Sequence, residues 1–80
     1  MESSFEIKNK IEKIIFKVLY KNMVESKSIK STKTLIELVL ENCIFEKITI
    51  SEKNIKIIIN ELKNEKKIQF NQKEGWKIQI

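Results

Sequence analysis

The side chains with the clearest potential for chemistry are lysines and asparagines on one side of an expected helix at 51–66. At 100° per residue, one arc of this segment carries four aliphatic side chains, Ile55, Ile58, Ile59 and Leu62. The opposite arc carries Lys53, Lys56, Ile57, Asn60 and Asn64. A helix that buries the first arc and exposes the second could insert its polar side into a DNA groove.

Other kinds of chemistry find little support in the composition. The chain has no His and no Asp, its only cysteine is Cys43, and its only glycine is Gly75. The glutamates are spread over expected solvent-facing positions, whereas a catalytic pair needs a concave site. We therefore expect no enzyme, no catalytic residue, no metal site, no cofactor and no small-molecule substrate. Cys43 is expected to be a buried core residue in a reducing compartment.

The net charge is +5 and the pI about 9.4, and all of the positive charge comes from lysine, because the chain has no arginine. This balance favours polyanionic partners through long-range attraction and counterion release. A coding sequence rich in A and T would also enrich Lys, Ile and Asn, with no partner implied. No apolar run approaches the roughly 20 residues of a membrane span, and no secretory signal is evident. We expect an intracellular, soluble protein, cytoplasmic or nuclear, with no membrane partner.

The elements that would position the polar helix are two further helices in a single domain, 1–80. The first is expected from residue 5 to about 25, and the second from 34 to 43 or 44 with Ser31 or Thr32 as its cap. Between them, a very short strand is expected near Ile29. The apolar link at 44–50 should be extended and partly buried.

A β-hairpin is expected after the third helix, because 67–71 and 76–80 alternate apolar and polar residues. Gly75 stands where the loop needs a positive φ. One face of the hairpin should lie on the helices, with Ile68, Phe70, Trp76, Ile78 and Ile80 on it. The expected fold class is mainly α with a C-terminal β-hairpin (α+β).

Helix 5–25 carries more apolar surface than one core contact needs. Besides its aliphatic stripe it has a row of lysines and a third row, again apolar. The lysines are Lys10, Lys13, Lys17 and Lys21, and the apolar row is Phe5, Phe16, Tyr20 and Met23. The apolar row could lie under the hairpin or the chain termini. Alternatively, it could contact a second subunit or a larger protein partner.

The element order, together with "INELKNEKKIQF" and "GWKI", resembles the winged-helix family. Many members have an aliphatic residue, a leucine and a wing-starting aliphatic at the places of Ile59, Leu62 and Ile68. Many also have Gly where this chain has Lys66. The resemblance covers nearly the whole chain and implies a three-helix winged helix-turn-helix, used as a small DNA-binding or transcription-regulatory module.

The resemblance also implies roles for individual residues. Helix 51–66 would enter the major groove and 67–80 would be the wing. The groove-facing set would be Lys53, Lys56, Ile57, Asn60 and Asn64. Phosphate contacts would come from the start of the second helix, the wing and the loop before the second helix, namely Ser31, Thr32, Lys33, Lys73, Lys77, Lys27 and Lys30.

A second resemblance is to the C-terminal winged-helix module of cullin-type ubiquitin-ligase scaffolds, including that of the anaphase-promoting complex. It rests on the long 44–50 link with Phe45 near its start, and on Ile55, Ile59 and Leu62. It implies a protein-interaction module, in which a partner covers Ile57 and the apolar row of the first helix. The near-zero net charge of 51–66 and the absence of arginine favour this alternative.

Overall fold

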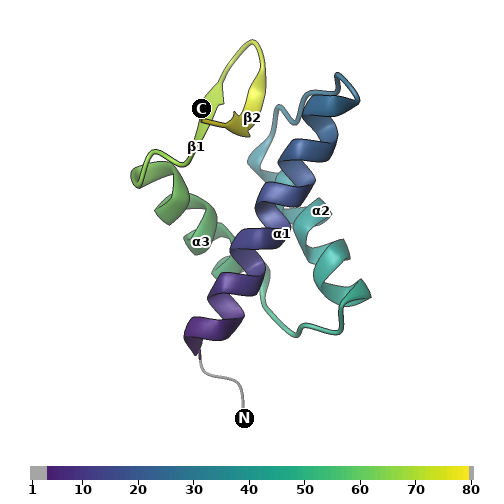
Figure 1. Ribbon diagram of the computed structural model, residues 1–80, viewed down its shortest axis with the longest axis vertical. Coiled ribbons are helices and arrows are strands. Elements are labelled where there is room, and N and C mark those ends of the chain that lie inside the picture. Colours follow the sequence, from purple (N-terminus) through teal and green to yellow (C-terminus); the bar gives the residue numbers. More distant parts are fainter. Residues whose placement is uncertain (1–3, 80) are drawn as a thin grey trace.

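The computed structural model describes residues 4–79, which form three helices followed by an antiparallel hairpin (Figure 1). The helices are α1 (Ser4–Val24), α2 (Thr32–Phe45) and α3 (Glu52–Asn64). The strands are β1 (Ile68–Asn71) and β2 (Gly75–Ile78), paired in the register Ile68 with Ile78 and Phe70 with Trp76. The expected fold class, mainly α with a C-terminal β-hairpin, is confirmed.

Serine caps start α2 and α3. The Ser31 hydroxyl accepts from the Thr34 N–H at 3.2 Å, and the Ser51 hydroxyl accepts from the Asn54 N–H at 3.2 Å. These bonds satisfy backbone donors that lack a partner within the first turn. The prediction of Ser51 is confirmed. Of the two candidates for α2 the cap is Ser31, so the helix begins two residues earlier than expected.

The three helices end in the same way, although none ends at a glycine. Ser26, Lys47 and Lys66 follow α1, α2 and α3 with φ of 57°, 61° and 62°. After α3, the Lys66 N–H donates to the Lys63 carbonyl and the Lys67 N–H donates to the Leu62 carbonyl, both at 3.0 Å. Two equivalent hydrogen bonds are made by the left-handed residue and the residue after it at the ends of α1 and α2. This is the Schellman arrangement, in which a left-handed residue lets the chain turn away from the helix.

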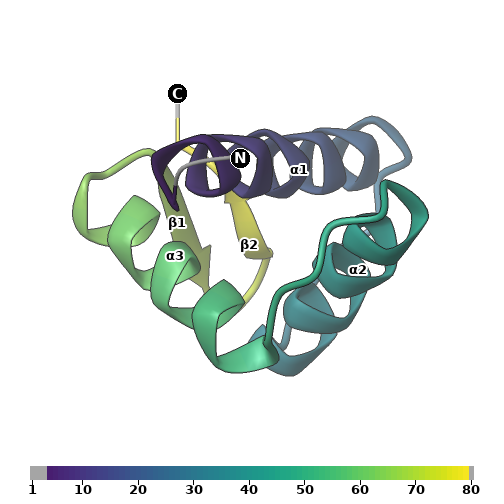
Figure 2. The same cartoon turned by 90° about the horizontal axis from the view of Figure 1, so that it is seen from below.

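One apolar core joins all the elements. Figure 2 shows the helices as three sides of a triangle, with the hairpin between α1 and α3; β2 contacts α1 and β1 contacts α3. The expected aliphatic arcs meet in the middle. The buried residues are Ile11, Ile14, Ile15, Val18 and Leu19 from α1, Leu35, Val39 and Cys43 from α2, Ile55, Ile58, Ile59 and Leu62 from α3, and Ile29, Ile68 and Trp76.

The link between α2 and α3 is shorter than expected. Ile44 and Phe45 belong to α2, where their side chains are 68% and 87% exposed. The prediction that 44–50 is extended and partly buried is therefore wrong for these two residues. Lys47, rather than a residue near Cys43, turns the chain out of the helix. Ile48 and Ile50 are half-buried, as expected for the rest of the link.

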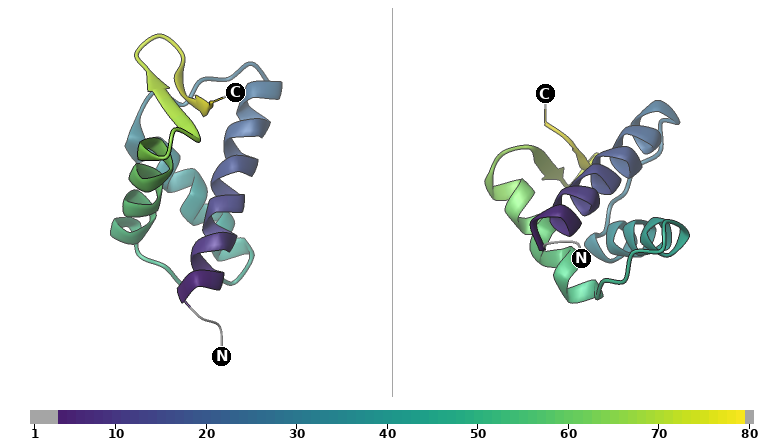
Figure 3. Two further views of the ribbon diagram at one scale, coloured as in Figure 1. Left: turned by 60° about the vertical axis from the view of Figure 1, so that its left-hand side comes forward. Right: turned by 60° about the horizontal axis from the view of Figure 1, so that its bottom comes forward.

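The hairpin stands at one end of the helices, away from the start of α1 (Figure 3). Its inner side is anchored by Trp76, which is 6% exposed and pairs with Ile29 through an N–H donated to the Ile29 carbonyl at 2.8 Å. The very short strand expected near Ile29 is reduced to this single bridge. Phe70 was expected on the covered face but is 39% exposed, although its direct strand partner Trp76 is buried. Ile80 lies outside the described residues.

Candidate nucleic-acid interface

The polar side of α3 is open to solvent over its whole length. Ile55, Ile59 and Leu62 on the opposite side are fully buried. No other segment within residues 4–79 covers the outward set, all of which is exposed: Lys53, Lys56, Ile57, Asn60 and Asn64. We call these five residues the outward face of α3. The division into a buried and an open side follows from the 3.6-residue period of the sequence.

The charge of this face differs from the charge of the helix as a whole. Glu61 points toward α1, where its carboxylate lies 2.8 Å from the Lys8 ammonium. Glu65, just after the helix, pairs with Lys67 at 3.4 Å. Within the described residues, Lys53 and Lys56 have no ion pair. The outward face therefore carries two lysines and no carboxylate.

The start of α2 lies beside the start of α3. A depression of about 190 Å³ between them is lined by Thr32, Lys33, Ile36, Glu37, Glu52 and Lys56. The fold thus brings together three residues predicted for nucleic-acid contact, along with two carboxylates. The Thr32 hydroxyl already accepts from the Trp76 indole N–H at 3.3 Å and its side chain is half-buried, whereas Lys33 is exposed.

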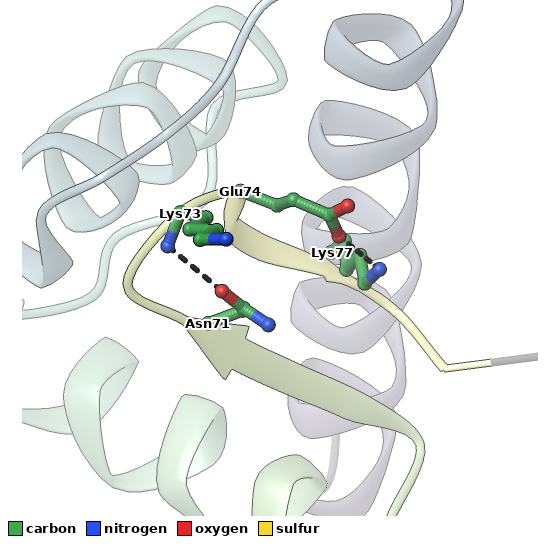
Figure 4. Close-up of polar contacts among 4 residues, drawn as sticks. All are labelled: Asn71, Lys73, Glu74 and Lys77. Atoms are coloured by element: carbon green, nitrogen blue, oxygen red, sulfur yellow. Dashed lines mark hydrogen bonds and ion pairs between the residues drawn. The ribbon is translucent and has the colours of Figure 1, made fainter.

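The two hairpin lysines predicted to contact phosphate, Lys73 and Lys77, have different surroundings (Figure 4). Lys77 is half-buried and its ammonium bonds to the Glu74 carboxylate. Lys73 is exposed, and its backbone N–H donates to the Asn71 side-chain oxygen at 2.7 Å, which shapes the loop. The Lys73 ammonium has no ion pair among the described residues, so of these two lysines it is the one whose charge is available to a phosphate.

Phe70 and Trp76, which were expected on one face of the hairpin, lie close together, but the position of Lys63 beside them was not anticipated. The rings of Phe70 and Trp76 lie 5.3 Å apart between centroids, and the Lys63 ammonium lies 5.9 Å from the Trp76 ring centroid. This geometry allows a cation–π interaction. The only available signal was the position of Lys63 at the edge of the outward arc, because the periodicity of α3 does not reveal on which side the hairpin folds back.

The apolar row of α1 is only partly covered. Phe16 is half-buried against the core, whereas Tyr20 is 64% and Met23 40% exposed. Phe5 belongs to the same row, but its side chain lies outside the described residues. Tyr20 and Met23 therefore remain open to a second subunit or another protein.

Metal ligands and the single cysteine are the remaining groups to consider in the part that the structure describes. Among residues 4–79, no cluster of His, Cys, Asp or Glu side chains could hold a metal ion. Cys43 is fully buried, and this burial, together with the nearby negative charge of Glu46, raises the pKa of its thiol. A thiol in such surroundings stays protonated and is a weak nucleophile.

Within the same residues, none of the helices is both long enough and apolar enough to cross a lipid bilayer. Comparisons with models of known protein families, with curated proteins and with solved structures find no match to this chain.

Proposed function

We propose that this chain is a small winged-helix DNA-binding module, used in transcription regulation. In this proposal the outward face of α3 enters the major groove and the hairpin lies along the backbone. The observation that carries it is the division of α3: Ile59 and Leu62 are fully buried, whereas Lys56 and Asn60 are exposed. Such a helix is held rigidly by the core while its polar side can reach base edges.

The ion pairs of α3 support the same function. Since Glu61 is paired with Lys8 on α1, its negative charge is directed away from the outward face. Lys53 and Lys56 then share the outward face with no carboxylate, although Lys56 also borders the depression lined by Glu37 and Glu52. Asn60 and Asn64 can each donate to and accept from an adenine edge, and Ile57 can contact a thymine methyl group.

Four exposed lysines without ion pairs would contact phosphate: Lys33, Lys53, Lys56 and Lys73. Four contacts give a log–log salt slope of about −3.6, so that affinity falls about 150-fold between about 50 mM and about 200 mM salt. Changing Lys53 and Lys56 to Ala should halve the slope. Affinity for DNA should then fall only about 12-fold over the same range of salt.

The test is fluorescence anisotropy with a labelled duplex of random sequence at several salt concentrations. The matched control is Lys13→Ala with Lys17→Ala, which removes the same charge from α1. We expect the control to keep the slope of the unaltered protein. Absent binding even at low salt, or equal slopes for the two double variants, would exclude α3 as the DNA-contacting helix.

The second candidate is a protein-interaction module like those of cullin-type scaffolds. It is favoured by the exposed Tyr20 and Met23, because large apolar side chains gathered on a surface often mark an interface. Sedimentation of the free protein tests one form of this candidate function, a homodimer through α1. Self-association that is lost in Tyr20→Ser would support a homodimer through α1, and a strict monomer at high concentration would exclude it.

A further inference from the structure

The lysine row of α1 has no role in the proposed DNA interface. Its four members are all exposed and lie within about 80° of one another around the helix: Lys10, Lys13, Lys17 and Lys21. At 1.5 Å per residue the row is about 16 Å long. Within the described residues, no ion pair joins Lys13, Lys17 or Lys21 to a carboxylate. Lys13, Lys17 and Lys21 therefore form a line of positive charge without an ion pair among these residues.

Two open depressions follow this row where α1 meets α2 and the link after it. One, of about 260 Å³, is lined by Lys10, Lys13, Ile14, Lys17, Glu46 and Ile48. The other, of about 320 Å³, is lined by Lys21, Leu38, Glu41, Asn42 and Phe45. We call the two together the basic groove. Even without Lys10, its lysines outnumber its two glutamates, Glu41 and Glu46.

Large apolar side chains border the basic groove. Phe45 lines the second depression and is 87% exposed, the most exposed of the large apolar side chains described. Tyr20 and Val24, which are 64% and 65% exposed, lie one turn from Lys17 and Lys21 on the outer side of α1. Nucleic-acid phosphates would satisfy the lysines, but the phosphate backbone beside them offers no apolar surface large enough to cover Phe45. A partner that offers carboxylates beside apolar side chains satisfies both.

We propose that the basic groove binds an acidic amphipathic helix of another protein. Carboxylates spaced three and four residues apart would face the lysine row, and a neighbouring apolar side chain would enter the depression beside Phe45. The groove lies between α1 and α2, whereas the DNA-contacting face belongs to α3, on another side of the triangle (Figure 2). DNA and the acidic helix can therefore be bound at the same time.

The test is selection of a displayed library of random peptides of about 16 residues, long enough to form a helix that spans the row. We expect enriched peptides with Glu or Asp at helical spacing beside large apolar residues. Synthetic versions of these peptides should bind about tenfold more weakly to Lys13→Glu/Lys17→Glu and to Phe45→Ser. The matched control, Lys53→Glu/Lys56→Glu, should bind them within about twofold of the unaltered protein.

Circular dichroism establishes that each variant is folded, and Phe45→Ser tests the groove without a charge change. Enrichment of peptides that lack acidic residues, no enrichment at all, or equal binding by the groove and control variants would overturn the proposal. So would a loss of duplex DNA binding in Lys13→Glu/Lys17→Glu as large as that in the control, because the row would then belong to the DNA interface. DNA binding is measured separately, so failure of one proposal leaves the other distinguishable.

Discussion

Gly75 holds the hairpin against the helical part of the molecule, and replacing it with alanine should loosen that contact. Its φ is +77°, in the left-handed region. A Cβ at this position would lie 2.2 Å from the Ile29 carbonyl oxygen, 2.6 Å from the Ile29 carbonyl carbon and 3.1 Å from the Lys30 Cα. These are backbone atoms, so the new methyl group can be accommodated only if the hairpin and the segment around Ile29 separate.

The cost of Gly75→Ala has two main parts. The left-handed conformation costs about 1–2 kcal/mol for a residue with a Cβ. Separation breaks the bond from the Trp76 N–H to the Ile29 carbonyl, now 2.8 Å long, which contributes about 1 kcal/mol. The free energy of unfolding should fall by about 2–3 kcal/mol, a large part of the roughly 4–12 kcal/mol typical of a domain of this size. The melting temperature should fall by about 8–24 °C.

Urea unfolding followed by the fluorescence of Trp76, the only tryptophan in the chain and 6% exposed, measures this change. Gln72→Ala, at an exposed position of the same hairpin loop, is the control and should stay within about 0.5 kcal/mol of the unaltered protein. A loss below about 1 kcal/mol for Gly75→Ala, with an unchanged denaturant slope, would refute the close approach of Gly75 to Ile29.

Three further predictions concern helix ends, an ion pair and the buried thiol. Lys66→Gly should raise the unfolding free energy by about 0.5–1 kcal/mol in the same assay. The reason is that glycine removes the conformational cost of the left-handed φ of 62°, and this gain exceeds the extra conformational entropy of the unfolded chain. A lower unfolding free energy would contradict the left-handed helix end. The hydrogen bond and negative charge of Glu61 raise the pKa of Lys8, so the pair stabilises the fold below pH 10.5, the ordinary lysine pKa, and this contribution is lost as pH rises through the higher value. The stability difference between the unaltered protein and Lys8→Met should therefore be constant near neutral pH and shrink in strong alkali, and a difference that grows there would argue against the pair. Cys43 should react with an aromatic disulfide reagent about 100-fold or more slowly in the folded than in the urea-unfolded protein, and comparable rates would show that the thiol is accessible.

The periodicity of the sequence was sufficient to predict the elements and the core. Each helix has an aliphatic arc that its neighbours bury, and Ile55, Ile59 and Leu62 are fully buried as expected. Alternation in the last residues, with a single glycine between them, predicted the hairpin. These features are local, and each appears directly in the order of the residues.

The helix ends were harder to predict, because no glycine marks them. Ser26, Lys47 and Lys66 adopt the left-handed conformation that glycine takes most readily. Without a compositional signal, α2 was expected to end near Cys43, and the exposure of Ile44 and Phe45 was missed. For this reason the sequence did not predict that Phe45 borders the basic groove.

The electrostatics of the candidate site depend on contacts between residues that are distant in sequence. The sequence gives α3 a charge near zero, but only the folded chain places Glu61 beside Lys8. The folded chain likewise brings the Thr32 hydroxyl within hydrogen-bonding distance of the Trp76 indole N–H. Such pairings depend on how the helices and the hairpin are arranged, which periodicity does not specify.

The central claim is that the outward face of α3 binds duplex DNA. The most direct measurement is an NMR titration of labelled protein with a short duplex of mixed sequence at low salt, followed through the backbone amide signals. We predict the largest shifts at Lys53, Lys56, Asn60 and Asn64 and at Lys33 at the start of α2. No shifts, or shifts confined to the basic groove between α1 and α2, would contradict the claim.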